Sequence, residues 1–262
     1  MAHIKIENLV KAYENRRKQR RKGDPVSVGE MIKVLDNINL EFADGEMVCI
    51  LGPSGCGKST MLKILAGFDT ATSGRILVDG REVKEPTSDY IFVFQHSGLL
   101  PWMTVWQNVE LGLRHMEDAA QKEAQIQEYI DMVELTNSEQ HYPHQLSGGM
   151  QRRAELARAL VVNPDMLIMD EPFTGLDFLT RMKMREEVVN MHEFIGKSIL
   201  MVTHDIDDAL VMADHIVVMG DNPTQVKMDR LLRFDRPRDV STGELAEIRD
   251  EIYFMLGVSY VV

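Results

Sequence analysis

The strongest chemical signal in the sequence is a glycine-rich stretch that consists of Gly52, Pro53, Ser54, Gly55, Cys56, Gly57, Lys58, Ser59 and Thr60. It matches the pattern G-x-x-x-x-G-K-[ST] of phosphate-binding loops. Glycines at three of its positions let backbone N–H groups turn toward an anion. Lys58 can place its ammonium against the β- and γ-phosphates, and the Ser59 hydroxyl can ligate Mg²⁺. The stretch therefore predicts a nucleotide site at the start of a helix.

A pair of acids, Asp170 and Glu171, follows the short apolar run over residues 166–169. If that run is a buried parallel strand, both carboxylates lie at the carboxyl edge of a sheet, where α/β proteins bind ligands. Beside a phosphate loop, Asp170 would hold Mg²⁺ and Glu171 would orient and activate a water. An acidic pair after a strand is by itself often only a solvated turn, so this prediction depends on the phosphate loop.

A second glycine-rich stretch precedes an expected helix and consists of Leu146, Ser147, Gly148, Gly149, Met150 and Gln151. The N-terminus of a helix offers free backbone N–H groups and a positive dipole end to an anion. The chain thus has two places suited to one class of ligand. A head-to-tail pairing of two copies can bring both onto the same nucleotide. The plain alternative is a glycine-rich helix cap that binds nothing.

The elements that position these residues alternate along the chain. Short apolar segments typical of buried strands cover residues 47–51, 91–94, 166–169, 198–203 and 215–219, and helical segments cover residues 58–66, 177–194 and 205–213. Shorter strand patterns cover residues 4–6, 38–42 and 76–78. Strands that alternate with helices favour an α/β fold with a parallel sheet.

Three further segments lie outside this alternation. Residues 105–162 are rich in Glu, Gln, Ala, Leu and Met and are expected to form an inserted helical subdomain. Residues 14–33 are polar and turn-rich, which indicates an exposed insertion. Near the C-terminus, residues 241–244 resemble a capping box. Apolar residues at helical spacing then predict a packing helix with Leu245, Ile248, Ile252 and Leu256 on its buried face.

The composition narrows the class of protein. The chain has 262 residues, 44% of them hydrophobic and 27% charged, which is an ordinary globular balance and not that of a disordered or disulfide-stapled chain. Its net charge of −12 disfavours general nucleic-acid binding. We find no secretory signal and no apolar run near the roughly 20 residues that span a bilayer. The two cysteines, Cys49 and Cys56, are expected to be free thiols in a reducing compartment.

Together with the phosphate loop, residues 146–150 resemble the signature of ATP-binding-cassette (ABC) ATPases, over about residues 4–220. The resemblance implies an α/β P-loop NTPase fold with a mixed RecA-like sheet core, an N-terminal antiparallel β subdomain and an inserted helical subdomain. Residues 1–262 would form a single ABC ATPase domain. Its parts would be a nucleotide-binding core (about 4–95 and 163–220), the helical subdomain (about 96–162) and a C-terminal extension (221–262).

The resemblance also implies roles for single residues. Gln95 is similar to the Q-loop glutamine, which contacts Mg²⁺ or the attacking water and senses the transport domain. His204 is similar to the switch histidine on the γ-phosphate, and Asp177, in the stretch 174–177, to the D-loop aspartate that crosses the dimer interface. Tyr13 is the candidate for stacking on adenine, although a plain packing tyrosine is the alternative.

The implied activity is Mg-ATP hydrolysis coupled to transport. Glu171 would be the general base, with Ser59, Gln95 and Asp170 around Mg²⁺, while Ser147, Gly148, Gly149 and Gln151 would act in trans. The implied partners are a second ATPase subunit (a homodimer is expected), integral membrane permease subunits and, indirectly, an extracytoplasmic solute-binding protein, with no nucleic acid. The expected location is peripheral, at the cytoplasmic face of the cell (inner) membrane.

The segment 99–105 after Gln95, together with residues 169–173 and 179–181, resembles the nitrate/sulfonate/taurine importer subunits. That resemblance implies transport of a small, anionic solute. Trp102 and Trp106 are either exposed anchors for the permease or core aromatics of the helical subdomain.

Three features depart from that importer pattern: Thr174-Gly175 in the D-loop, the order Gln151-Arg152-Arg153, and a long insertion with Arg16, Arg17, Lys18, Arg20, Arg21 and Lys22. The basic run either contacts anionic lipid headgroups or is a solvated loop. Three alternatives stay open: a lipid-handling or export ABC complex, a non-transport ABC ATPase, and an inert nucleotide-binding module.

Overall fold

The computed structural model describes the chain except residues 1, 15–30, 96–97, 221 and 258–262. Its main sheet has the strand order β10-β9-β3-β8-β7-β6. The strands are β3 (Met47–Leu51), β6 (Tyr90–Val93), β7 (Met166–Asp170), β8 (Ser198–Val202), β9 (His215–Gly220) and β10 (Gln225–Leu231). All neighbours are parallel except β10, which runs antiparallel to β9. Because helices cover both faces, the central strands are apolar throughout.

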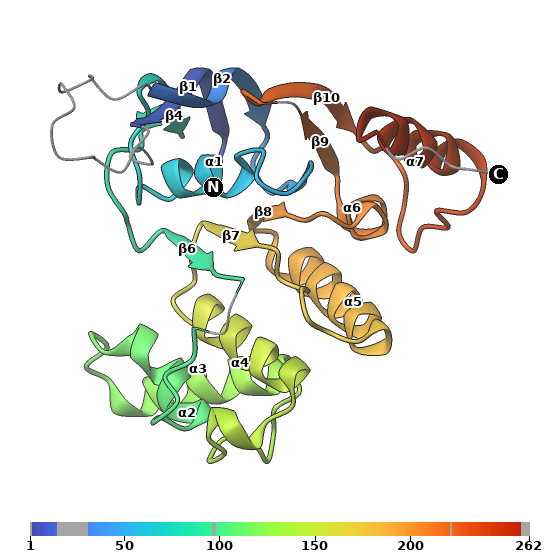
Figure 1. Ribbon diagram of the computed structural model, residues 1–262. Helices are drawn as coiled ribbons and strands as arrows, with labels where there is room; N and C mark the ends of the chain where they lie inside the picture. The colour runs from blue at the N-terminus through green and yellow to red at the C-terminus, as the bar shows by residue number, and fades with distance from the viewer. Residues whose placement is uncertain (1, 15–30, 96–97, 221, 258–262) are drawn as a thin grey trace, which may run out of the picture.

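A second, antiparallel sheet has the order β2-β1-β4-β5, formed by β1 (Ile4–Glu14), β2 (Met31–Phe42), β4 (Ser73–Val78) and β5 (Arg81–Glu82). Helix α1 (Lys58–Leu65) lies between the two sheets (Figure 1). Val48 and Ile50 of β3 face a core shared with α1 and the second sheet. Met47, Cys49 and Leu51 face the opposite core, which includes helices from the rest of the chain.

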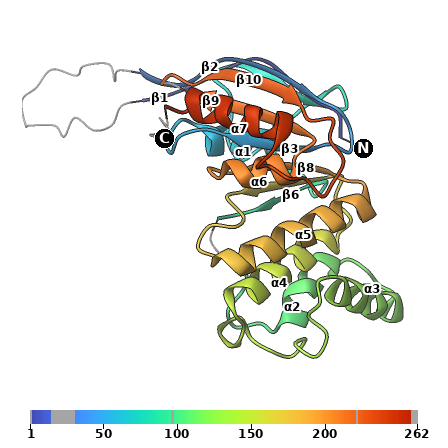
Figure 2. The ribbon, with the colours of Figure 1, turned by 90° about the vertical axis from the view of Figure 1, so that its right-hand side faces the viewer.

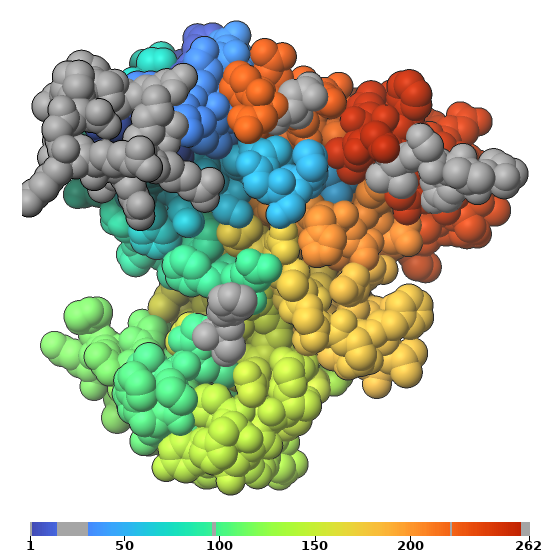
Figure 3. All heavy atoms as spheres, in the orientation of Figure 1, coloured from blue at the N-terminus to red at the C-terminus, as the bar shows by residue number. Residues whose placement is uncertain are grey.

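The segment between β6 and β7 contains a lobe of helices (Figure 1, Figure 2). Its elements are α2 (Val105–Glu110), η1 (Leu111–Leu113), α3 (Ala119–Met132), η2 (Pro143–Gln145) and α4 (Gly148–Leu160). The space-filling view shows this lobe projecting from the rest of the molecule (Figure 3). The predicted α/β fold, with its parallel strands, antiparallel N-terminal sheet and inserted helices, is confirmed.

The remaining helices are α5 (Phe178–Ile195), α6 (Ile206–Met212) and α7 (Gly243–Met255). The predicted α7 packs through Leu245, Ile248 and Ile252, which are buried, while Leu256 is half-buried. The predicted capping box is wrong: the N-cap is Thr242, whose side chain makes no capping bond. The reason is the register, because with Thr242 as the N-cap Glu244 lies only two residues further on, one short of the capping-box spacing. The hydroxyls of Ser241 and Thr242 instead point at the Asp239 carboxylate, to which they donate at 2.5 and 3.3 Å.

Strand lengths differ from the sequence-based boundaries. The patterns at residues 4–6 and 38–42 are parts of the longer β1 and β2, so that Glu14 and residues 31–33 of the expected insertion lie in strands. Strand β10 was not predicted, although Val226 and Met228 alternate with polar neighbours. The basic run over residues 16–22, for which lipid contact and a solvated loop were the two alternatives, lies outside the described residues.

The two tryptophans differ in exposure: Trp102 lies on the surface, whereas Trp106 packs inside the helical lobe. Trp102 is 69% exposed. Trp106, within α2, is half-buried and packs against the core of the helical lobe.

Within the described part of the chain, no helix has the length and apolar composition that a bilayer crossing requires. Both cysteines are free and buried, as expected for unpaired thiols.

Candidate nucleotide site

Four neighbouring parallel strands deliver the predicted residues to one edge of the main sheet. The glycine-rich loop follows β3, His204 lies just after β8, Asp170 and Glu171 lie at the end of β7, and Gln95 lies just after β6. The order β3-β8-β7-β6 makes these strands direct neighbours. Since carboxyl ends of parallel strands meet at one edge, the residues form a single site.

The glycine-rich loop wraps around the side chain of Lys58. Lys58 is only 5% exposed, and its Nζ donates to the carbonyl oxygens of Gly52 at 2.8 Å and Pro53 at 3.0 Å. Gly57 has φ +108°, and a Cβ there would lie 2.8 Å from Val34. A side chain at this position would therefore be strained and would collide with β2. The loop thus holds an ammonium group at its centre, ready to exchange carbonyl oxygens for an anion.

Ser59 and Asp170 form the oxygen-rich side of the site. The Ser59 hydroxyl donates to Oδ1 of Asp170 at 2.9 Å. Burial and the neighbouring Glu171 raise the pKa of Asp170 above its ordinary value, against the lowering effect of the Ser59 bond. A cation beside this pair would favour the ionised carboxylate, and hydroxyl and carboxylate oxygens are ligands that suit Mg²⁺.

The protein alone offers few metal ligands here. Among the described residues, no group of three or more His, Cys, Asp or Glu side chains is arranged to hold a metal ion. Mg²⁺ is usually held in nucleotide sites by one or two carboxylates together with substrate phosphates. The pair Ser59 and Asp170 fits a magnesium ion that arrives with a nucleotide.

The Glu171 carboxylate contacts three other side chains of the site. Its Oε2 accepts hydrogen bonds from Gln95 Nε2 at 3.2 Å and Thr174 Oγ1 at 3.1 Å, and lies 3.4 Å from His204 Nδ1. Its backbone has φ +48°, which is uncommon for a residue with a side chain, and its N–H donates to the Val202 carbonyl at 2.9 Å. Such backbone conformations concentrate at functional sites. Glu171, Gln95 and His204, predicted separately, are thus brought together.

Thr174 was noted in the sequence only as a departure from the importer pattern, and no contact with Glu171 was predicted for it. A second missed group lies behind His204: Arg181 of α5 pairs with Asp205 at 2.7 Å, and Arg185 pairs with the buried Asp208 of α6. Burial and the nearby Asp205 raise the pKa of Asp208 to about 6. The spacing places both arginines on one face of α5 and both acids on one face of α6, but no sequence signal indicates that the two faces meet.

The second glycine-rich stretch forms the start of α4. Ser147 is its exposed N-cap, and the hydroxyl accepts a hydrogen bond from the Met150 N–H at 3.3 Å. Gln151 is turned toward its own chain, because its Nε2 donates to the carbonyl of Pro143 at 2.8 Å. Gly149 has no room for a side chain, since a Cβ would lie 2.8 Å from Thr180.

The two glycine-rich motifs are separate within one chain. Helix α4 lies in the projecting lobe, whereas α1 lies between the two sheets (Figure 1). Among the described residues, no hydrogen bond or ion pair joins residues 147–151 to residues 52–60. The start of α4 is therefore free to meet a ligand outside its own chain's loop.

Asp177, predicted as the D-loop aspartate, is the N-cap of α5. Its Oδ1 accepts a hydrogen bond from the Thr180 N–H at 3.1 Å, and hydrogen bonds with Thr180 lower the pKa of the carboxyl. The next two residues, Phe178 and Leu179, are large apolar side chains exposed to solvent. Exposed apolar residues that adjoin a site are typical of a protein–protein contact.

Tyr13 lies beside α1, in contact with Thr60 and Asp69. Its hydroxyl donates to Asp69 Oδ2 at 2.6 Å, and Asp69 also accepts from Lys11 Nζ at 2.5 Å. The Lys11 ammonium lies 4.7 Å from the centre of the Tyr13 ring. Two neighbours thus fix a ring that is 40% exposed, which leaves aromatic surface available to a ligand.

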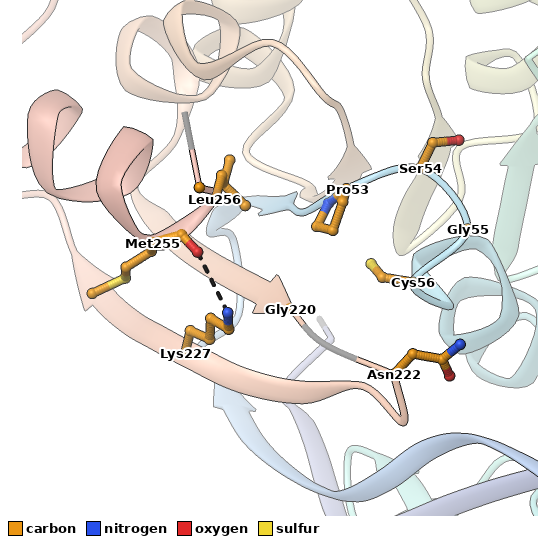
Figure 4. Close-up of a pocket in the computed structure, with 10 residues that line it drawn as sticks. Pro53, Ser54, Gly55, Cys56, Gly220, Asn222, Lys227, Met255 and Leu256 are labelled. Carbon is orange, nitrogen blue, oxygen red and sulfur yellow. Dashed lines mark hydrogen bonds between the residues drawn. The ribbon is translucent and has the colours of Figure 1, made fainter. Parts of the chain in front are cut away.

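A cavity of about 510 Å³ adjoins the outer side of the glycine-rich loop (Figure 4). It is lined by Pro53, Ser54 and Cys56 of the loop and by Lys227, Met255 and Leu256. The Lys227 side chain crosses Gly220, where a Cβ would lie 2.3 Å from Lys227 Cε, and donates to the Met255 carbonyl at 3.4 Å. The C-terminal extension therefore borders the loop.

The chain is similar in sequence to several known proteins. A family model described as "ABC transporter" matches residues 35–174. An uncharacterised ABC transporter ATP-binding protein of Methanocaldococcus jannaschii is 40% identical over 97% of this chain and 91% of its own. A nitrate import ATP-binding protein of Synechocystis sp. is 40% identical over 92% and 85%. An aliphatic sulfonates import ATP-binding protein of Bacillus cereus is 38% identical over 84% and 87%.

A solved structure shares the fold as well. It is the dimeric post-hydrolysis state of the ATP-binding cassette MJ0796, bound to ADP and Pi. It is 32% identical to this chain, with a TM-score of 0.72 over 88% of this chain and all of that chain.

Proposed function

This chain belongs to the ABC transporter family of ATP-binding proteins, and on that premise we propose that it hydrolyses Mg-ATP as one half of a cassette dimer that powers import of a small anion. The predicted resemblance to nitrate and sulfonate importers is confirmed at the level of sequence. The names of those relatives support an anionic solute. The observation that carries the hydrolytic part is the convergence of Gln95, Thr174 and His204 on the Glu171 carboxylate.

The chain's own groups suit phosphoryl transfer to water. The Lys58 ammonium exchanges its bonds to two loop carbonyls for phosphate oxygens, while the loop N–H groups surround the anion. Glu171 accepts a proton from the attacking water, Gln95 orients that water, and His204 steadies the γ-phosphate. Ser59, Asp170 and Gln95 would hold Mg²⁺. When bound, the ion would neutralise negative charge on the β- and γ-phosphates.

A second copy completes each site in this proposal. ATP held by Lys58 and Ser59 of one chain meets Ser147, Gly148 and Gly149 of the other, with Gln151 bracing that motif. The support is the separation of the two motifs within one chain and the dimeric form of the similar cassette. Asp177 and the apolar residues after it would lie in the contact between the copies.

Complementation tests this arrangement. Lys58→Ala and Ser147→Arg are each expected to abolish turnover alone. A mixed dimer has one intact site, because the defects then coincide at the other site. With random pairing and independent sites, an equimolar mixture recovers about a quarter of the parent phosphate release. Mixed dimers verified by native mass spectrometry that remain inactive would contradict the shared site.

Tyr13 is proposed to stack on adenine. Tyr13→Ala is expected to raise the KM for ATP roughly tenfold with little change in kcat, because base–aromatic stacking contributes about 1–3 kcal/mol. Tyr13→Phe is the matched control, since it keeps the ring and loses only the hydroxyl with its bonds to Asp69 and Thr60. Steady-state kinetics decide, and an unchanged KM in Tyr13→Ala would assign the ring to packing.

The permease is proposed to dock beside Trp102, whose side chain is exposed in the segment that follows Gln95. Trp106 is excluded as a second anchor because it packs into the helical lobe. In this proposal the chain is peripheral at the cytoplasmic face of the membrane, and a solute-binding protein delivers the anion on the other side. Co-purification from membranes, with partners identified by mass, tests the assembly.

A further inference from the structure

A buried ion pair lies one turn inside α4, close to the Ser147 cap. Arg152 Nη1 and Glu155 Oε2 are 2.6 Å apart, and the two side chains are only 6% and 4% exposed. Arg152 belongs to the unusual order Gln151-Arg152-Arg153 noted in the sequence. Removing two charges from water is costly, so a buried pair is weak grounds for stability alone. The contacts of this pair indicate another purpose.

The pair holds the chain on both sides of Gln95. Arg152 Nη1 donates to the Phe94 carbonyl at 2.8 Å, and Glu155 Oε1 accepts from the Gly98 N–H. Arg158, one turn further along α4, donates to the Gly98 carbonyl at 2.7 Å. The Arg158 guanidinium also packs against Gly98, because a Cβ there would lie 2.9 Å from Arg158 Nη2. Residues before and after Gln95 are thus fastened to one helix.

Some hydrogen-bond donors of the Arg152 guanidinium have no acceptor among the described residues. Its Nε and Nη2 are buried and have no hydrogen-bond partner among the described residues. A pair retained only for stability would satisfy these donors, because each unpaired buried donor carries a desolvation cost. The one donor atom with partners, Nη1, is the one that contacts both Glu155 and the Phe94 carbonyl.

We propose that Arg152 and Glu155 are positioning residues that make Gln95 and the Ser147–Gly149 tip of α4 move as one body. Gln95 contacts Glu171 of its own site, whereas, in the proposed dimer, the tip of α4 contacts the nucleotide of the other copy. A shift of Gln95 on nucleotide binding is therefore passed along α4 to the opposite site. This inference rests on the proposed function.

The chain provides its own reporter for a test. Its only tryptophans are Trp102 and Trp106, so Trp106→Phe leaves a single, exposed indole four residues after Gly98. In that background, Mg²⁺ with a non-hydrolysable ATP analogue is expected to shift Trp102 fluorescence. Arg152→Gln is expected to remove most of this shift and to lower kcat roughly ten- to a hundredfold with KM for ATP nearly unchanged.

Arg153→Gln is the matched control, because Arg153 lies on the same helix and pairs instead with the exposed Glu134 at 3.2 Å. It is expected to keep both the shift and kcat. A full Trp102 shift and parent kcat in folded Arg152→Gln would overturn the proposal. So would a parent protein that hydrolyses ATP with no Trp102 shift.

Arg152→Gln leaves Glu155 buried without its partner and can fail to fold. The double variant Arg152→Met/Glu155→Met removes both charges and keeps the apolar volume. If it folds by circular dichroism, a lost shift and lowered kcat support the coupling, whereas parent behaviour overturns it. Failure of the proposed function itself is distinguishable, because the unmodified chain would then show no ATP turnover or complementation.

Discussion

Replacing Glu171 with glutamine is expected to lower ATP turnover by roughly 10²–10⁴-fold while ATP binding persists, the range typical of losing a general base. Glutamine has nearly the same shape, and its amide oxygen can still accept the bonds that Gln95 and Thr174 now donate to Glu171. What it cannot do is take a proton from the attacking water. Phosphate release measures turnover, and isothermal titration calorimetry measures binding.

A suitable control is Glu186→Gln, which makes the same chemical change at an exposed position of α5. Its turnover and its affinity for ATP should match those of the parent protein. If Glu171→Gln hydrolysed ATP at the parent rate, Glu171 would lose its assignment as the base, and the shared contacts with Gln95, Thr174 and His204 would need another explanation.

The second large effect is expected at Lys58. Lys58→Ala should weaken ATP binding roughly a hundredfold or more, because each hydrogen bond to a charged group contributes about 1.5–3 kcal/mol. The ammonium is buried, and among the described residues it donates only to the Gly52 and Pro53 carbonyls, which phosphate oxygens can replace. Titration with a fluorescent ATP analogue measures the change.

Lys63→Ala is the control for this variant, since Lys63 is exposed on the same helix. Because Lys58 also contacts the loop carbonyls, thermal unfolding of both variants should be compared with that of the parent. A folded Lys58→Ala protein that binds ATP with parent affinity would exclude the glycine-rich loop as the phosphate site.

The sequence predicted those parts of the site that depend on strand ends. Lys58, Glu171 and His204 each follow an apolar run, and parallel strands bring their ends together whatever the intervening chain does. Contacts between side chains far apart in sequence were not predictable. The pairing of Arg185 with Asp208 depends on how α5 packs against α6, and the hydrogen bond from Arg152 to the Phe94 carbonyl depends on the position of α4.

Local sequence patterns were also insufficient near the starts of helices. The stretch 241–244 has the residues of a capping box, but α7 has Thr242 and not Ser241 as its N-cap, and both hydroxyls are oriented toward the Asp239 carboxylate. Trp102 and Trp106 are four residues apart and chemically identical, yet only the second lies within α2 and packs inward. Burial of such a residue is decided by the position of the helix start, which sequence fixes poorly.

The placement of Lys58, Asp170, Glu171 and His204 at the ends of adjacent strands has an evolutionary consequence. In the proposed dimer the start of α4 also contacts a nucleotide, so the helical lobe can diverge without disturbing hydrolysis only away from Ser147–Gly149 and from the Arg152–Glu155 pair. Natural selection can therefore adapt one ATPase to different transport partners by changing the remaining surface of the lobe, while the strand ends and the start of α4 stay the same.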